Sequence, residues 1–339
     1  GLSKGVMLTH ENLIANLVLT SSINTLRDED VLIGVLPFFH IYGMVLILNL
    51  AIYRGVTLVT MPRFDLDQFL DIVQTYKISC LNLVPPLLLA LSKHPAVDNY
   101  DISSIRLISS GAAPLGQELE QACSERLDCQ VYQGYGLTEV AGASHINTIP
   151  VPVEKIGAVG KVVPNTYSKI IDTETGKELG TNERGEVLIK GPHVMPGYLN
   201  NKEATEHCID QEGWFHTGDI GYADEDGYFF IVDRVKELIK YKAYQVAPAE
   251  LEALLVSHDR IADAAVIPSP DEEAGEIPKA FVVLKGQITA EEIMTFVAER
   301  VAPHKKIRSL EVVEEIPKSA SGKILRRVLV EQERERHKN

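Results

Sequence analysis

The chain has 339 residues, a length that corresponds to about two domains. Hydrophobic residues make up 45% and charged residues 24%, as in soluble globular proteins, and 33 basic against 47 acidic residues give a formal charge of −14. An acidic surface argues against nucleic acid or an anionic membrane as a partner, because both require basic surfaces. The four cysteines form no CxxC pair, which disfavours a disulfide framework and a thiolate zinc site.

The stretch Val31–Tyr53 carries no Asp, Glu, Lys or Arg and is long enough to span a bilayer. Pro37, Gly43 and Asn49 interrupt it, however, and predict a buried strand, a loop and then a buried helix. We therefore expect no membrane span and, since no signal peptide is visible, a cytoplasmic protein. The chain starts in a loop-like sequence without an initiator Met, so we expect that an N-terminal segment of the same protein is missing.

Residues 12–133 alternate between short apolar runs of strand length and segments with apolar residues at helical spacing. This alternation predicts parallel βαβ units with helices on the faces of the sheet. We assign residues 1–150 to this α/β subdomain, which we expect to be truncated at its N-terminal end. The runs are Val31–Leu36, Val56–Met61, Ile78–Val84 and Ile105–Ser110, and the helical patterns include 66–76 and Leu115–Leu127.

Residues 151–232 contain shorter strands between Gly-rich turns. Turn signals such as Thr175-Gly176 and Asp226-Gly227 separate these strands. The pattern predicts a small antiparallel sheet or partial β-barrel subdomain. The strands are Ser168–Ile171, Gly185–Lys190 and Gly227–Val232.

From residue 237 the pattern becomes that of a separate α+β domain, 237–339, behind a boundary at 233–236. Pro248 suits the first turn of a helix that ends near Ser257. Thr289 and Glu292 form a capping box at the start of the next helix. Strands are predicted at Ala264–Ile267 and Lys279–Leu284.

Two segments of the first domain contain residue types that bind phosphates, bases or metal ions. Gly1–Gly5 combines glycines with a lysine, which suits a phosphate loop but also a plain surface turn. Gln133–Glu139 follows the last predicted strand, where the loops of parallel sheets bind ligands. Its tyrosine could stack on a base, its threonine could donate to a phosphate, and Glu139 could bind Mg²⁺. The alternative is a strand-to-helix turn with a solvated glutamate.

Four later segments carry similar signals, each beside a simpler interpretation. Trp214–Asp219 ends in an aspartate suited to the two hydroxyls of a ribose, or to a β-turn of its own. Asp233–Lys236 suits a salt-bridged linker. Lys240–Gln245 resembles a hairpin with outward lysines, or an edge strand protected by lysine. Pro317–Lys323 is a Ser/Gly loop whose lysine could reach a neighbouring domain, or a plain exposed loop.

Together, in this order, these segments resemble the AMP-forming acyl-adenylate synthetases, which include the acyl- and aryl-CoA ligases, the luciferases and adenylation domains. The resemblance extends over essentially the whole chain and is nearest to 4-coumarate–CoA ligases. Three stretches carry the nearer match: Leu36–Tyr42, Ser110–Leu115 and Ile239–Glu250.

The resemblance implies a reaction in two steps. A carboxylic acid and ATP with Mg²⁺ would give an acyl-adenylate and pyrophosphate, and CoA would then displace AMP. A carboxylate must approach a polyanion in the first step, so cations are needed to offset repulsion.

By position, the resemblance implies that Lys4 holds the β- and γ-phosphates, that Thr138 binds the α-phosphate and that Glu139 ligates Mg²⁺. Lys323 would be the catalytic lysine of adenylation, and Thr138, Glu139 and His40 would take part in catalysis. The other residues that it assigns to ATP or AMP are Gly111, Ala112, Ala113, Gln133, Gly134, Tyr135, Gly136, Asp219, Arg234, Lys236 and Gln245. The residues that it assigns to the acyl pocket are His40, Tyr42, Gly111, Gln133 and Gly134.

The resemblance further implies that the C-terminal domain is mobile and rotates about a hinge at 233–236 between the half-reactions. The rotation would replace Lys323 by the hairpin with a second catalytic lysine, Lys240, and with Lys242 and Ala243 at the CoA site. The family usually has glycine at the position of Ala243, so its methyl group could narrow the CoA tunnel.

Several functions compatible with the resemblance stay open. The expected activity is ligation of aryl-propenoic acids to CoA. The alternatives are a medium- or long-chain fatty acyl-CoA ligase, a luciferase-like enzyme that oxidises the adenylate, and an inert binding fragment. An amino-acid-activating domain is disfavoured because Phe38–Gly43 offers no acidic residue for an α-amine.

Overall fold

A computed structural model describes residues 4–23, 26–242, 244–319 and 322–336. The chain divides into two units, which are described separately. Unit 1 comprises Gly1–Thr217 and Gly221–Ile231, and unit 2 comprises Gly218–Ile220 and Val232–Asn339. Among the described residues, no helix is long and apolar enough to cross a membrane.

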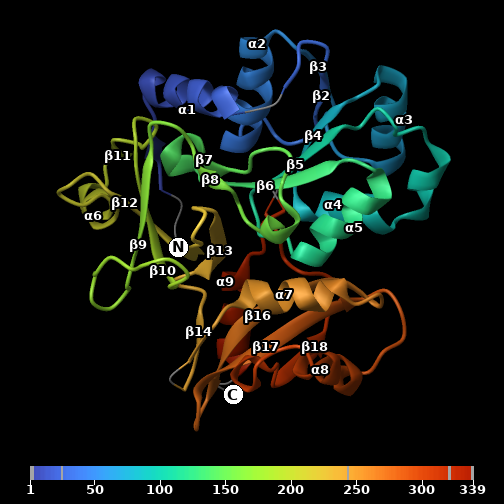
Figure 1. Cartoon of the computed structure of the whole chain (residues 1–339). Helices are drawn as coiled ribbons and strands as arrows, with labels where there is room; N and C mark the ends of the chain where they lie inside the picture. The colour runs from blue at the N-terminus through green and yellow to red at the C-terminus, as the bar shows by residue number, and fades with distance from the viewer. Residues whose placement is uncertain (1–3, 24–25, 243, 320–321, 337–339) are drawn as a thin grey trace. The chain divides into compact units, whose positions relative to one another are not determined.

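The largest element of unit 1 is a seven-stranded sheet in the order β3-β2-β4-β5-β6-β7-β8 (Figure 1). The first five strands in this order are parallel, as the alternating pattern predicts, whereas β7 runs antiparallel to both β6 and β8. The strands are β2 (Val31–Gly34), β3 (Thr57–Thr60), β4 (Cys80–Leu83), β5 (Leu107–Ser110), β6 (Gln130–Leu137), β7 (Gly142–Ile146) and β8 (Lys161–Val162).

Helices cover both faces of this sheet, because each face is apolar and must be buried. Phe69 and Leu88 belong to a cluster on one face, and Leu50 and Leu32 belong to a second cluster that involves the first helices. The helices are α1 (His10–Ile23), the π-helix η1 (Tyr42–Asn49), α2 (Leu50–Arg54), α3 (Leu66–Tyr76), α4 (Pro85–Lys93), η2 (Pro95–Asn99), α5 (Gln117–Leu127), η3 (Thr138–Val140) and η4 (Val153–Lys155). The predicted strand, loop and helix over residues 31–53 are therefore confirmed, and the predicted helix at Leu115 begins two residues later, at Gln117.

Gln133–Leu137 is not the loop that the sequence suggests but the second half of β6. The first half of β6 pairs with β5, and the second half turns to pair with β7, with Gly134 opposite Ile146 and Gly136 opposite Ala143. The sequence alone predicts that the strand ends where its pairing with β5 ends. β6 instead continues, because β7 pairs with its second half.

Unit 1 also contains a four-stranded sheet in the order β13-β12-β10-β9, whose strands β12 and β13 include residues of both units. A short strand near the N-terminus, β1, pairs with β11 and places Val6 opposite Tyr198. These elements are β9 (Tyr167–Ile171), β10 (Gly185–Lys190), β12 (Phe215–Ala223), β13 (Phe229–Arg234), β1 (Val6–Met7), β11 (Gly197–Tyr198) and the helix α6 (Lys202–Cys208).

Unit 2 is built on a five-stranded sheet with the path β15-β14-β17-β16 and with β18 beside β17. One apolar cluster includes Leu251 and Ile293, and a second includes Phe281 and Leu329, so helices bury both faces. Both predicted helix starts are confirmed: Pro248 opens α7, and Thr289 caps α8 in a capping box with Glu292. The elements are β14 (Ile239–Tyr241), β15 (Tyr244–Val246), α7 (Pro248–Ser257), β16 (Ile261–Asp271), β17 (Gly275–Leu284), α8 (Ala290–Ala298), η5 (Pro303–Lys305), β18 (Ser309–Val312) and α9 (Arg326–Arg336).

The turn in the path of β6 depends on Gly136. A Cβ at this position would lie 1.9 Å from the carbonyl oxygen of Gly142, whereas a Cβ on Gly134 would come no closer than 3.4 Å to a neighbouring atom. Gly136→Ala should therefore lower the free energy of unfolding of unit 1 by about 3 kcal/mol. The measurement is urea unfolding followed by the fluorescence of Trp214, the single tryptophan, which lies in unit 1. Gly134→Ala is the matched control, and equal losses in the two variants would contradict the prediction.

Two histidines, His145 and His193, are fully buried in unit 1, and burial lowers their pKa values to about 3 and about 4. Neither ring nitrogen of His193 has a hydrogen-bond partner in the described part of the chain. Because the unfolded chain takes up protons near pH 6.5 and the folded state does not, both histidines reduce stability as the pH falls from about 6.5 to about 4.

His193→Gln should remove the contribution of one of these histidines. The free energy of unfolding of the variant, relative to that of the unmodified chain, should rise by about 2–3 kcal/mol as the pH is lowered from 7 to 4. Urea unfolding at several pH values, again followed by Trp214 fluorescence, measures this difference. A constant difference across the range would show that His193 does not titrate in this way.

Candidate functional site

Tyr42 and Gly111, two residues predicted to line an acyl pocket, are in contact. A Cβ at position 111 would lie 3.0 Å from Cε1 of Tyr42, so any larger residue would require the ring to shift. The Tyr42 hydroxyl donates to the carbonyl oxygen of Ser109 at 3.2 Å, and burial raises its pKa above the ordinary value. His40 accepts a hydrogen bond from the Tyr42 backbone N–H through Nδ1 at 3.2 Å, and partial burial lowers the pKa of its imidazole.

The segment that follows β5, residues 111–116, is held by Gln133. The Gln133 side chain accepts from the N–H of Leu115 at 3.2 Å and donates to its carbonyl oxygen at 3.1 Å. It also donates to Glu120 at 2.6 Å, and burial raises the pKa of this glutamate to about 7. Within the segment, Ala112 has a φ of +68°. Both amide hydrogens of Gln133 are therefore engaged, and we expect this residue to shape the segment rather than to donate to a ligand.

Tyr135 projects from the second half of β6, between the two glycines of the motif. It lies opposite His145 on β7, with their ring centroids 5.7 Å apart, and it is half-buried. The strand therefore fixes the backbone on both sides of an aromatic ring that keeps part of its surface exposed.

Lys4 and Glu139 meet on one side chain, Tyr198. The Tyr198 hydroxyl donates to Glu139 Oε1 at 2.7 Å, and the Nζ atom of Lys4 lies 4.0 Å from the centroid of the Tyr198 ring. Burial and the neighbouring Glu139 raise the pKa of Tyr198, which keeps its hydroxyl protonated as a donor. Pairing of β1 with β11 brings Lys4 to this tyrosine, and the short helix η3 presents Glu139 together with the exposed Thr138.

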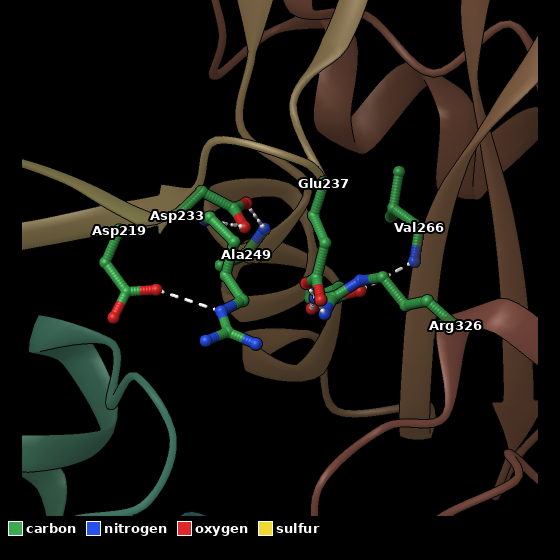
Figure 2. A network of polar contacts seen from close by, with 8 residues as sticks. Asp219, Asp233, Glu237, Ala249, Val266 and Arg326 are labelled. Carbon is green, nitrogen blue, oxygen red and sulfur yellow. Dashed lines mark hydrogen bonds and ion pairs between the residues drawn. The ribbon is translucent and has the colours of Figure 1, made fainter. Parts of the chain in front are cut away.

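In unit 2, Asp219 and Arg234 form an ion pair. Arg234 Nε donates to Asp219 Oδ1 at 2.9 Å, as Figure 2 shows, and Asp219 is only 6% exposed. Gly218 has a φ of +70°, a left-handed conformation that glycine adopts readily, and its carbonyl oxygen accepts from the N–H of Val235. The turn before Asp219 is thereby tied to the chain that follows Arg234.

Lys323 is exposed and lies in the electrostatic field of this pair. Partial desolvation and the positive charge of Arg234 lower the pKa of Lys323, whereas Glu237 and Asp219 act in the opposite direction. The structure thus brings three residues of the sequence prediction together in unit 2. Lys236, the fourth, is exposed.

The predicted hairpin is present as β14 and β15, and it places Lys240 opposite Gln245. Both lysines of the hairpin are exposed, and Lys242 pairs with Glu273 at 2.7 Å, which raises the pKa of the lysine. Ala243 lies outside the described residues.

Two residues that contact this machinery escaped the sequence analysis. No sequence motif marks Tyr198, because its contacts with Lys4 and Glu139 depend on the pairing of β1 with β11, which lie far apart in the chain. Arg326 lies three residues after Lys323, and the motif ended at the lysine. Only its partners, the half-buried Glu237 and the buried Glu252, distinguish it from its neighbour Arg327.

The described part of the chain holds no cluster of three or more His, Cys, Asp or Glu side chains arranged to bind a metal ion. A metal here would have to complete its ligand set with water or with a bound substrate. The four cysteines are free and buried.

Comparisons with known proteins agree with this architecture. The sequence profile of the AMP-binding enzymes matches residues 1–199, and that of the AMP-binding enzyme C-terminal domain matches residues 250–323. A 4-coumarate–CoA ligase of Pinus taeda is 49% identical over 97% of this chain and 63% of its own length. The chain thus spans less than two thirds of that relative.

Solved structures give the same result. ATP-bound MatB from Rhodopseudomonas palustris is 30% identical, with a TM-score of 0.89 over 98% of this chain and 66% of that one. O-succinylbenzoate coenzyme A synthetase from Bacillus subtilis, in complex with ATP and magnesium, is 31% identical, with a TM-score of 0.86 over 96% of this chain and 67% of that one. The first profile alone covers more than half of the sequence. The chain belongs to the AMP-binding enzyme family.

Proposed function

We propose that the protein is an ATP-dependent carboxylate–CoA ligase that acts on aryl-propenoic acids. In the first step an oxygen of the substrate carboxylate attacks the α-phosphorus of ATP, and the bond to pyrophosphate breaks. In the second step the thiolate of CoA attacks the acyl carbon, and the bond to AMP breaks. The 49% identity to a relative named as a 4-coumarate–CoA ligase supports this choice of acid.

The observation that carries the proposal is the meeting of Lys4 and Glu139 on Tyr198. A triphosphate that carries a divalent cation needs a positive charge for its terminal phosphates and a hard oxygen ligand for the metal. Lys4 supplies the first and Glu139 the second, and Tyr198 keeps them adjacent.

Magnesium fits this residue set. Tyr198 engages Oε1 of Glu139, and the second carboxylate oxygen is suited to the metal. Mg²⁺ is usually held by one or two carboxylates together with substrate phosphates and water, so a single glutamate is sufficient. When bound, the metal would supply charge neutralisation at the phosphates, while Lys4 and Thr138 orient them.

The remaining roles follow the geometry of each unit. Tyr42, Gly111 and His40 would border the acyl group, and Tyr135 would offer its exposed surface to adenine. Asp219, whose orientation Arg234 fixes, would accept hydrogen bonds from the ribose hydroxyls. Lys323 would place its ammonium at the α-phosphate during adenylation.

In this proposal the segment 233–236 is a hinge. Rotation about it would replace Lys323 by the hairpin that carries Lys240 and Gln245 for the step with CoA. The cytoplasmic location stays a prediction. The substrate is identified by incubating the protein with Mg·ATP, CoA and a panel of aryl and fatty acids, followed by mass spectrometry. A fatty acyl-CoA as the main product would overturn the choice of acid, and the absence of any acyl-adenylate would overturn the ligase.

Lys323→Ala should abolish formation of the acyl-adenylate and spare transfer of the acyl group from a supplied adenylate to CoA. The reason is that only the first step brings a carboxylate to a polyanion, where a missing cation is most costly. Pyrophosphate exchange measures the first step, and release of AMP on addition of CoA measures the second. Lys318→Ala is the control, since this lysine lies in the same loop but pairs with Asp263. Equal loss of both steps in Lys323→Ala would contradict the exchange of lysines.

Asp219→Asn should weaken the binding of ATP about tenfold, because a carboxylate accepts from hydroxyls more strongly than an amide does. Isothermal titration with ATP measures the change. Asp263→Asn provides a matched control, because Asp263 is also an aspartate of unit 2 in an ion pair with a cation. An unchanged affinity in Asp219→Asn would remove this residue from the ribose site.

A further inference from the structure

A cluster of buried charges lies immediately after Lys323 in the chain. Arg326, the first residue of α9, donates through Nη1 to Glu237 at 2.5 Å and through Nη2 to Glu252. The side chains of Arg326, Glu237 and Glu252 are 13%, 23% and 11% exposed. The desolvation cost of such charges offsets most of the attraction between them, so a buried ion pair is weak evidence of added stability and the cluster points to another task.

The partners of Arg326 belong to different elements (Figure 2). Glu237 follows β13 in the turn toward β14, and Glu252 lies on α7. Glu252 also accepts from the N–H of Val266 on β16 at 2.7 Å. Arg326 thus fastens the start of α9 to two other parts of unit 2, the turn after β13 and the helix α7, and Glu252 links α7 to β16. Burial raises the pKa of Glu252 to about 7, although Arg326 acts against this shift.

A fourth charged residue, Asp233, connects β13 to the helix α7. Asp233 accepts from the N–H of Arg234 at 2.7 Å and from the N–H of Ala249, near the start of α7, at 2.8 Å. Arg234 in turn holds Asp219. The ion pair assigned to ribose and the arginine after Lys323 therefore rest on one helix, α7.

The loop of Lys323 is short and closed by backbone hydrogen bonds. The Ser319 N–H donates to the carbonyl oxygen of Lys323 at 2.9 Å, and the Leu325 N–H donates to that of Pro317 at 2.8 Å. Only two residues separate Lys323 from Arg326. A shift of Arg326 would therefore move the lysine.

We propose that Arg326 is a positioning residue: held by Glu237 and Glu252, it sets Lys323 beside the Asp219–Arg234 pair. The inference rests on the proposed role of Lys323 in adenylation. It adds that Arg326, Glu237 and Glu252, none of which is proposed to touch the substrate, fix the position of this lysine, and that Arg326 and Glu237 contribute to its charge state.

The charges that face Lys323 make the inference testable. Asp219 and Glu237 raise the pKa of Lys323, whereas Arg234 and Arg326 lower it. Loss of the negative charge of Glu237 should therefore lower this pKa, and loss of the positive charge of Arg326 should raise it. A merely structural role would not produce opposite shifts from two partners of one ion pair.

The first experiment is competitive labelling of lysines with acetic anhydride over a range of pH, read by peptide mass spectrometry. In Glu237→Gln the midpoint for Lys323 should move down, so that its labelling at a fixed pH below the midpoint becomes about threefold faster, equivalent to about half a pKa unit. In Arg326→Met the midpoint should move up. Arg327→Met is the control, because Arg327 is the exposed neighbour whose partner is Glu331, one turn further along α9.

Arg326→Met leaves two buried carboxylates without their partner and could fail to fold, which circular dichroism would show. In that case the labelling midpoint of Lys323 in Glu237→Gln is the test of the inference, since this variant keeps the pair of Arg326 with Glu252. Midpoints that stay unchanged in the folded variants would overturn the inference.

The second experiment measures the half-reactions in Arg326→Lys. Lysine keeps the charge but cannot bind two carboxylates in one plane, so kcat of adenylation should fall about tenfold while KM for ATP and the transfer to CoA stay unchanged. Equal rates in Arg326→Lys and the unmodified protein would overturn the positioning role. If Lys323→Ala leaves adenylation intact, the proposed function fails, and the labelling midpoints still test the electrostatic part of the inference.

Discussion

The close approach of β6 and β7 is the constraint on which the architecture of unit 1 depends. β6 completes the parallel part of the large sheet and then crosses to an antiparallel partner, and the backbones meet where Gly136 lies beside Gly142. This change of partner aims Tyr135 toward His145 and delivers Thr138 and Glu139 on the short helix η3. The strand therefore fixes the positions of an aromatic ring, a hydroxyl and a carboxylate at once. In the proposed function all three side chains would lie near one nucleotide, and a continuous strand leaves their positions little freedom.

Local sequence signals predicted the elements whose causes are local. The bounds of α7 and the capping box of α8 were predictable because a proline at the first turn and a Thr–Glu pair act within one turn of helix. β16 runs from Ile261 to Asp271, well beyond the predicted Ala264–Ile267, because its ends are held by pairing with β17 rather than by their own composition. Gln133–Leu137 was taken for a loop for the same reason: its glycines indicate a turn unless the partner strand is known.

The candidate site divides in the same way. The motifs proposed to bind phosphate and ribose and to supply the lysines could be found from residue types and order, since those types are few and their order along the chain is regular. The residues that orient them could not. Tyr198 acquires its role from a strand pair that joins residues about 190 positions apart, and Arg326 differs from Arg327 only in what buries it. A side chain that touches a substrate can be recognised in the sequence by its chemistry. A residue that orients such a side chain can be recognised only by its position in the folded chain, which the local sequence does not show.

Asp233 gives the proposed hinge a mechanical property. Its carboxylate is 4% exposed and accepts from the N–H groups of Arg234 and Ala249, so it joins the segment 233–236 to the start of α7. Burial raises the pKa of this carboxyl, which means that the folded chain holds the ionised group at some expense in hydration. A rotation that broke the bond to Ala249 would return the carboxylate to water, and the regained hydration would offset the lost hydrogen bond. In the proposed mechanism, breaking this hydrogen bond would therefore need little net free energy, and the two orientations of the C-terminal domain would stay close in free energy.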